Sequence, residues 1–115
     1  MMKLKETENQ IQSAICEYLT LMRFFFWRQN TTPIFDTRDG GFRRMPKYSK
    51  KGIPDIFVIV KGQMICFEVK SVIGIQSPEQ KEFQQACELN DIQYHVVRSI
   101  DEVEKVLKNH STRWG

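Results

Sequence analysis

The sequence has no long apolar run: no stretch approaches the roughly 18 consecutive apolar residues that a membrane-spanning helix needs. It has no internal repeat either. The first residues, Met1 to Glu6, turn polar at once and lack the apolar core of a signal peptide. These absences argue against a membrane protein and a repeat array, and we expect a cytoplasmic protein.

Cysteine and histidine are also scarce, with three and two residues respectively. Cys16, Cys66 and Cys87 lie on separate segments among apolar neighbours, and none forms a Cys-x-x-Cys pair. Only His95 and His110 could join them as zinc ligands, which makes a structural zinc site a poor explanation. We expect free cysteines that pack as small hydrophobic side chains.

What the chain does have is the composition of an ordinary soluble globular protein, with 41% hydrophobic and 27% charged residues. Its 115 residues suffice for one core. We therefore expect a single domain over residues 1–115, with an ordered core from about 7 to 107.

The net charge of +3 is weak information, but its distribution is uneven. Between residues 38 and 51 the only acid is Asp39. The basic residues of this segment are Arg38, Arg43, Arg44, Lys47, Lys50 and Lys51. A solvated loop would explain this cluster, and so would a surface that contacts phosphates, because such contacts come from clustered Lys and Arg. Composition leaves both interpretations open.

Three capping-box patterns, which begin at Thr7, Ser77 and Ser99, predict the starts of three helices. Apolar residues at three- and four-residue steps follow each of them. The first helix should end near Arg23 and the second near Asn90. The second helix should turn three side chains inward: Phe83, Ala86 and Cys87.

Four segments read as strands: Phe24 to Gln29, Asp55 to Lys61, Met64 to Lys70, and Gln93 to Arg98. The first is aromatic and should be buried on both faces. The second and third flank a Gly62-Gln63 turn and should form a hairpin. In the third, Glu68 and Lys70 should share a face opposite Phe67. A long connection spans residues 30–52. The order α-β-β-β-α-β-α predicts an α/β sandwich around a mixed sheet.

Candidate chemistry lies at one end of this hairpin. Asp55 opens one strand and Glu68 closes its partner, so the two carboxylates should meet, with Lys70 beside them. Close carboxylates repel unless a cation neutralises them, and Mg²⁺ needs only one or two carboxylates because it keeps several waters. A lysine there can act on a water or stabilise charge on a phosphate. A Pro-Asp turn and a solvent-facing Glu-x-Lys strand end would explain the same residues.

Two further residues fall where they could reach the same end of the sheet. Glu8 lies in the first turn of the first helix, and Gln80 lies in the first turn of the second. Each also has an ordinary explanation, because Glu is favoured at a helix N-terminus and Gln80 completes a capping box.

Pro54-Asp55 followed by Glu68-x-Lys70 resembles the signature of the PD-(D/E)xK nuclease superfamily. More narrowly, the chain resembles a stand-alone VRR-NUC domain (virus-type replication-repair nuclease) from about Thr7 to Leu107. The matching residues are Glu8 with Ile11-Gln12, Trp27-Arg28-x-Asn30, Gly52-x-Pro54-Asp55, Glu68-x-Lys70 and Ser77-x-x-Gln80. The resemblance implies a restriction-endonuclease-like fold.

The resemblance also implies roles. Asp55, Glu68 and the backbone carbonyl of Val69 would bind Mg²⁺, with Mn²⁺ able to substitute, and Glu8 would join them directly or through water. Lys70 would act on the attacking water. Gln80 would position Lys70 or the scissile phosphate. Arg28 and Asn30 would contact DNA. We expect the basic cluster to contact DNA as well, but the segment from Asn30 to Lys51 does not match the family closely, so this expectation rests on its charge alone.

The activity expected from the resemblance is that of a Mg²⁺-dependent, structure-selective DNA endonuclease. Stand-alone members resemble Holliday-junction resolvases that act as homodimers on branched DNA, and two symmetric cuts suit a twofold dimer. The aromatic run Phe24 to Trp27 could serve such a dimer or fill the core.

Three alternatives remain open. One is a less selective nicking or flap nuclease acting on branched or duplex DNA, or the cleavage subunit of a larger complex. Another is a non-catalytic DNA-binding module of the same fold. The third is a metal-free RNA endonuclease that uses His95 with a lysine and a tyrosine.

Overall fold

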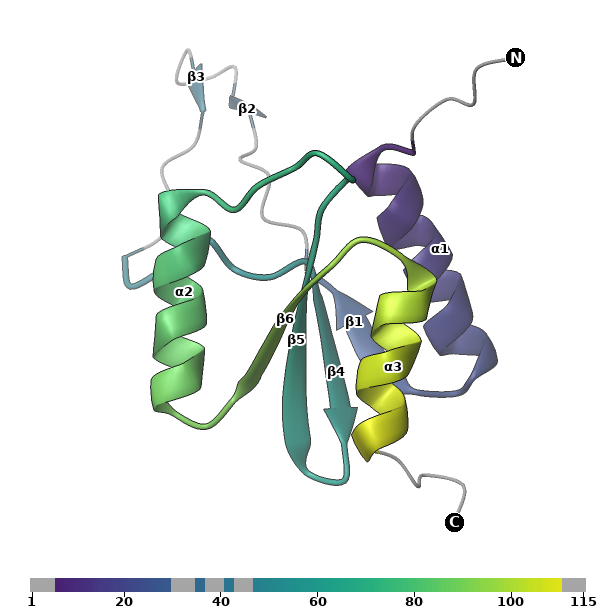
Figure 1. Cartoon of the computed structure of the whole chain (residues 1–115). Coiled ribbons are helices and arrows are strands. Elements are labelled where there is room, and N and C mark those ends of the chain that lie inside the picture. The colour runs from purple at the N-terminus through teal and green to yellow at the C-terminus, as the bar shows by residue number, and fades with distance from the viewer. Residues whose placement is uncertain (1–5, 30–34, 37–40, 43–46, 111–115) are drawn as a thin grey trace, which may run out of the picture.

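The computed structural model describes residues 6–29, 35–36, 41–42 and 47–110. The elements, shown in Figure 1, are α1 (Glu8–Leu21), β1 (Phe25–Arg28), β2 (Phe35–Asp36), β3 (Gly41–Phe42), β4 (Ile56–Val60), β5 (Gln63–Val69), α2 (Pro78–Leu89), β6 (Gln93–Val97) and α3 (Ile100–His110). Apart from β2 and β3, they follow the predicted order, with bounds within about two residues of those expected.

The main sheet has the strand order β1-β4-β5-β6. β4 pairs antiparallel with β1 and with β5, whereas β5 and β6 run parallel. The predicted hairpin is therefore confirmed, and Gly62 makes its turn with a φ of +80°. The crossover from β5 to β6 runs through α2, as a parallel pair requires.

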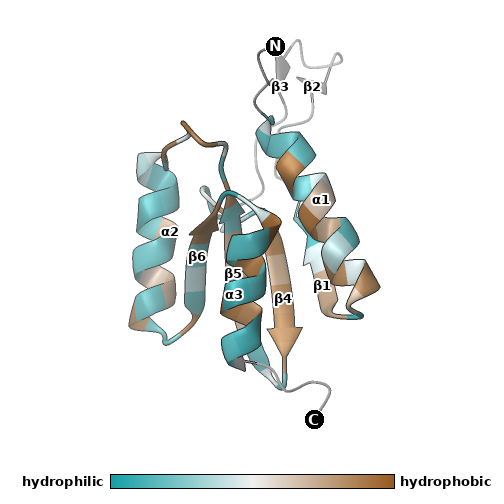
Figure 2. Ribbon diagram, turned by 45° about the vertical axis from the view of Figure 1, so that its right-hand side comes forward, coloured by the Kyte–Doolittle hydropathy of each residue, from teal (hydrophilic) through white to brown (hydrophobic). Residues whose placement is uncertain are grey.

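Helices cover both faces of this sheet, with α1 and α3 on one face and α2 on the other (Figures 1 and 2). Ile15 of α1, Leu107 of α3 and Phe67 of β5 share one core cluster. Cys87 of α2 and Cys66 of β5 share the other. Each fully buried Ile, Leu or Phe side chain contributes about 1.5–3 kcal/mol. The predicted α/β sandwich around a mixed sheet is confirmed.

The capping boxes of α1 and α2 are formed as predicted. That of α3 is only half formed. Ser99 Oγ accepts from the Glu102 N–H at 3.3 Å, but the Glu102 carboxylate accepts from Arg98 N–H instead of Ser99 N–H. The expected inward face of α2 also needs correction: Cys87 is buried and Phe83 partly so, but Ala86 is exposed and faces a surface pocket.

The expectation that the first strand is buried on both faces is wrong. β1 is an edge strand, with Phe25 68% and Trp27 37% exposed. Phe24 and Phe26 pack on the core shared by α1 and α3. On the other face α2 contacts β6 and does not cover β1, so Trp27 stacks on the ring of Phe57 at 5.3 Å and stays partly exposed. The aromatic run is thus half core and half surface.

Within the long connection, β2 and β3 form a small two-stranded sheet that the sequence did not predict. Its two-residue strands are too short to show a period-2 pattern. Among the described helices, none combines the length and the apolarity needed to cross a bilayer.

Candidate active site

Asp55 is held across the end of the β4-β5 hairpin. Its backbone N–H donates to the Phe67 carbonyl at 3.1 Å. Its side-chain Oδ2 accepts from the Val69 N–H at 2.8 Å, so this carboxylate continues the ladder where backbone pairing stops. The preceding Pro54 is buried and has no N–H to satisfy. The carboxylate of Asp55 is therefore fixed beside the last residues of β5.

Glu68 is the most buried ionisable group described at this end of the sheet, with 2% of its surface exposed. Its Oε2 accepts from Gln80 Nε2 at 2.9 Å. Its Oε1 is buried and has no hydrogen-bond donor among the described residues. A buried acceptor of this kind costs about 1–3 kcal/mol, and more when charged, so it calls for a missing partner.

Burial first, and then the charge of Asp55, raise the pKa of Glu68 to about 8 against a lowering by Lys70. The carboxyl groups of Asp55 and Glu68 can hydrogen-bond to each other only while one carries a proton. When both are ionised, two negative charges lie close together and Glu68 Oε1 has no donor among the described residues. The ionised pair therefore requires a cation.

Lys70 supplies one positive charge. It is only 8% exposed, and its Nζ lies 3.7 Å from Glu68 Oε2 and 4.0 Å from Glu8 Oε1. Both distances exceed the range of a good hydrogen bond, so the attraction is between charges. The solvent-facing explanation of Glu68 and Lys70 is wrong, because α2 covers this face of β5.

Gln80 completes its capping box and also reaches Glu68. Its Oε1 accepts from the Ser77 N–H at 2.8 Å, which completes the capping box. The remaining amide group, Nε2, then points to Glu68. The cap decides the orientation of the amide, since the oxygen is committed to Ser77. The structure thus brings Asp55, Glu68, Lys70 and Gln80 together, with Glu8 at the margin.

One residue that sequence reasoning missed is Arg98, at the end of β6. Its Nη1 donates to the carbonyls of Ser71 and Gly74, the latter at 2.8 Å. Gly74 lies against the side chain of Lys70, where an added Cβ would come within 3.4 Å of Lys70 Cδ. Arg98 therefore fixes the loop that packs on the lysine. No spacing in the sequence links it to Lys70.

The described members of the predicted DNA-contacting set lie on two segments, Arg28 in β1 and three lysines in residues 47–51. Arg28 is exposed, but its guanidinium donates to Gln12 at 2.9 Å and to Asn9 at 2.5 Å, both on α1. Lys47, Lys50 and Lys51 are exposed. The other predicted contacts, Asn30, Arg38, Arg43 and Arg44, lie outside the described residues.

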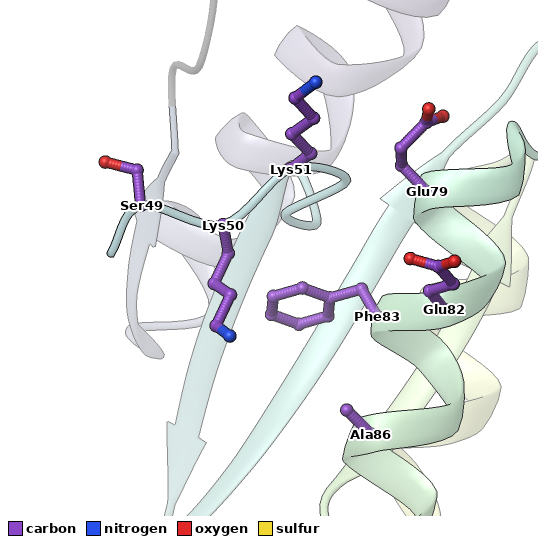
Figure 3. A pocket seen from close by; sticks show the side chains of 7 residues that line it. All are labelled: Ser49, Lys50, Lys51, Glu79, Glu82, Phe83 and Ala86. Carbon is purple, nitrogen blue, oxygen red and sulfur yellow. The ribbon is translucent and has the colours of Figure 1, made fainter. Parts of the chain in front are cut away.

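A pocket of about 510 Å³ lies between residues 49–51 and α2. Figure 3 shows Phe83 pointing from α2 into it, with Lys50 and Lys51 on one side and Glu79 and Glu82 on the other. The residues that line the pocket neighbour Gly52 and Gln80 in the sequence, but Asp55 and Glu68 are not among them. Two lysines and two glutamates line this pocket, so its formal charges cancel and do not favour an anionic ligand.

The donor set fits a hard divalent cation. Among the described residues, no three His, Cys, Asp or Glu side chains gather closely enough to hold a metal by themselves. Two carboxylates suffice for Mg²⁺ or Mn²⁺, which keep several waters, whereas a structural zinc site needs four protein ligands. The unpartnered Oε1 of Glu68 beside Asp55 is the observation that favours such an ion.

His95 does not join this group. It alternates with Tyr94 along β6, and its ring lies 6.0 Å from that of Phe67, on the face opposite Glu68. Its Nε2 is 3.0 Å from Gln93 Oε1. A site that combines His95 with Lys70 and Tyr94 is therefore not supported.

No family model and no curated protein matches the sequence. Among solved structures, the chain is similar to one described as "VRR_NUC domain", with a TM-score of 0.63 and 18% sequence identity. The match covers 92% of this chain and 100% of that chain. The predicted VRR-NUC fold is thereby confirmed.

Proposed function

We propose, starting from this VRR-NUC fold, that the protein is a divalent-metal-dependent nuclease that hydrolyses phosphodiester bonds in DNA. The observation that carries the proposal is the buried carboxylate of Glu68, with Asp55 on one side, Lys70 on the other and one oxygen without a donor. A protein gains no stability from such an arrangement, so it indicates a functional site.

Asp55, Glu68 and the backbone carbonyl of Val69 would hold Mg²⁺, or Mn²⁺ in its place, with Glu8 joining directly or through water. The ion would supply Lewis-acid stabilisation of charge on the phosphate. Asp55 is preorganised for this role because the Val69 N–H fixes its Oδ2. Glu68 is preorganised because Gln80 fixes its Oε2 and leaves Oε1 available.

Lys70 would hold the attacking water or a phosphate oxygen with the protons of its Nζ. The ammonium lies between Glu68 and Glu8 at distances too long for hydrogen bonds, so these acids keep it in place without consuming its donors. Burial of Lys70 strengthens its effect on charge that develops on the phosphate. Gln80 acts on this group through Glu68.

The finer proposal is a structure-selective endonuclease that resolves Holliday junctions as a homodimer. One site cuts one strand, whereas a four-way junction needs two symmetric cuts, which a twofold dimer supplies. The exposed lysines near α2 (Lys50 and Lys51) would contact phosphates of the branched DNA.

The test is cleavage of four DNAs, a four-way junction, a flap, a nicked duplex and a linear duplex, with Mg²⁺, Mn²⁺ or EDTA. We expect cleavage with either metal, none in EDTA, and symmetric cuts in the junction. Lys70→Ala should abolish cleavage but leave junction binding, whereas Lys105→Ala, on the exposed face of α3, should leave both.

Two outcomes would change the proposal. Equal cutting of all four substrates would replace the resolvase with a less selective nuclease. Binding of junctions without cleavage by the wild-type protein, across titrations of both metals, would instead leave a non-catalytic DNA-binding module.

A further inference from the structure

Gly52 stands where the chain turns towards Asp55, and its backbone has a φ of +74°. This left-handed region favours glycine. The space around it is more restrictive than the dihedral angle. A Cβ on Gly52 would lie 2.4 Å from the Glu79 carbonyl oxygen and 2.7 Å from the Gln80 nitrogen. The first turn of α2 therefore rests directly on the backbone of Gly52.

We propose that Gly52 is a positioning residue of the active site: its missing side chain lets the first turn of α2 approach, which brings the amide of Gln80 to Glu68. This inference rests on the proposed function of the site. Gly52 itself would contact neither metal nor DNA.

The connection runs through one side chain. Gln80 is held by the cap, because its Oε1 accepts from the Ser77 N–H and Ser77 Oγ accepts from the Gln80 N–H at 3.2 Å. Its amide can therefore reach Glu68 only from where the helix start places it. A Cβ at Gly52 would displace the backbone of Gln80 itself, and with it the donor at 2.9 Å from Glu68.

Gly62 offers a matched control. It has nearly the same dihedral angle, with a φ of +80°, but an added Cβ would meet no atom within 4 Å. An alanine at either position has the same unfavourable backbone. Only at Gly52 does it also push α2 away. The difference between Gly52→Ala and Gly62→Ala thus isolates the close approach from the strain.

The first readout is the side-chain amide signal of Gln80 in the ¹H–¹⁵N spectrum of the metal-free protein. We expect this signal to move in Gly52→Ala and to stay in place in Gly62→Ala. The second readout is DNA cleavage at saturating Mg²⁺. We expect kcat to fall about 100-fold in Gly52→Ala, with a KM for DNA within about threefold of wild type. Gly62→Ala should keep kcat within about twofold, because the hairpin turn lies at the far end of β4 and β5.

A double variant tests whether Gly52 acts through Gln80. If it does, adding Gly52→Ala to Gln80→Ala should lower kcat by no more than about threefold beyond Gln80→Ala alone. Additive losses would overturn the proposal. So would an unmoved Gln80 signal in Gly52→Ala, or equal losses of kcat in Gly52→Ala and Gly62→Ala.

Circular dichroism establishes first that each variant folds. If Gly52→Ala does not, Ser77→Ala loosens the same helix start from its other side by removing the acceptor for the Gln80 N–H. We then expect the Gln80 signal to move and kcat to fall. If neither changes in Ser77→Ala, the proposal is wrong. A wild-type protein that cuts no DNA would refute the proposed function, whereas the Gln80 signal would still test the placement.

Discussion

Replacing Glu68 with Gln should make the metal-free protein more stable than the wild type at pH 8 but not at pH 5. The pKa of Glu68 is raised from 4.5 to about 8, first by burial and then by the charge of Asp55. In the folded protein Glu68 therefore keeps its proton where the unfolded chain has lost it. The stability from this proton is fully present below pH 4.5 and is lost as the pH rises through 8.

The size of this effect follows from the shift. At about 1.36 kcal/mol per pH unit, a pKa raised from 4.5 to about 8 corresponds to about 5 kcal/mol. The solvent cannot screen the charge, since Glu68 is 2% exposed. The whole stability of a small domain is about 5–15 kcal/mol, so the loss is a large part of it. Glutamine keeps the shape of the protonated carboxyl and does not titrate.

The assay is urea unfolding of the wild type and Glu68→Gln in EDTA at pH 5, 6, 7 and 8. The difference in unfolding free energy should grow in favour of Glu68→Gln by about 3.5 kcal/mol between pH 5 and pH 8, because part of the full effect already falls below pH 5 and Glu68 is only half ionised at pH 8. Mg²⁺ at 100 times its dissociation constant should restore about 2.7 kcal/mol to the wild type at pH 8 and nothing to the variant.

A difference between the two proteins that stays constant from pH 5 to pH 8 would refute this reasoning. It would mean that Glu68 has an ordinary pKa and that its burial does not prepare a cation site.

Three other variants test neighbouring parts of the site. Gln80→Glu keeps an acceptor for the cap but replaces the donor to the buried carboxylate with a negative charge, so kcat should fall about 100-fold while circular dichroism stays unchanged. Arg98→Ala removes two hydrogen bonds from a charged donor to the loop carbonyls of Ser71 and Gly74, and should lower the free energy of unfolding in urea by about 3 kcal/mol. Amide hydrogen exchange in this loop should become faster, and unchanged stability would mean that Arg98 does not fix the loop. Replacing Lys50 and Lys51 with Gln should reduce the salt dependence of junction binding by about two units of slope, and an unchanged slope would mean that neither contacts a phosphate.

The sequence predicted the helices well because the signals that start them are local. The capping boxes at Thr7 and Ser77 involve residues three apart, and both are formed. The β4-β5 hairpin was equally accessible, because a Gly-containing turn joins two apolar runs. With these elements placed, the meeting of Asp55, Glu68 and Lys70 followed from alternation along the strands.

Burial could not be predicted in the same way, because it depends on elements distant in sequence. Whether Glu68 faces solvent or a helix depends on where α2 crosses the sheet. For the same reason Trp27 of β1, which α2 does not cover, is partly exposed. The close contact between Gly52 and the first turn of α2 joins residues 27 or more positions apart, and no periodic pattern in the sequence indicates it. The hydrogen bond from Arg98 to the Gly74 carbonyl is a tertiary contact of the same kind.

The most direct test of the account is the single-turnover cleavage rate of Asp55→Asn on a four-way junction with Mn²⁺, compared with wild type and with Glu88→Gln. Glu88 is an exposed acid near the far end of α2 and serves as the matched control. We expect Glu88→Gln to cut at the wild-type rate and Asp55→Asn to bind the junction without cutting it. Cleavage by Asp55→Asn at the wild-type rate would contradict the assignment of this site.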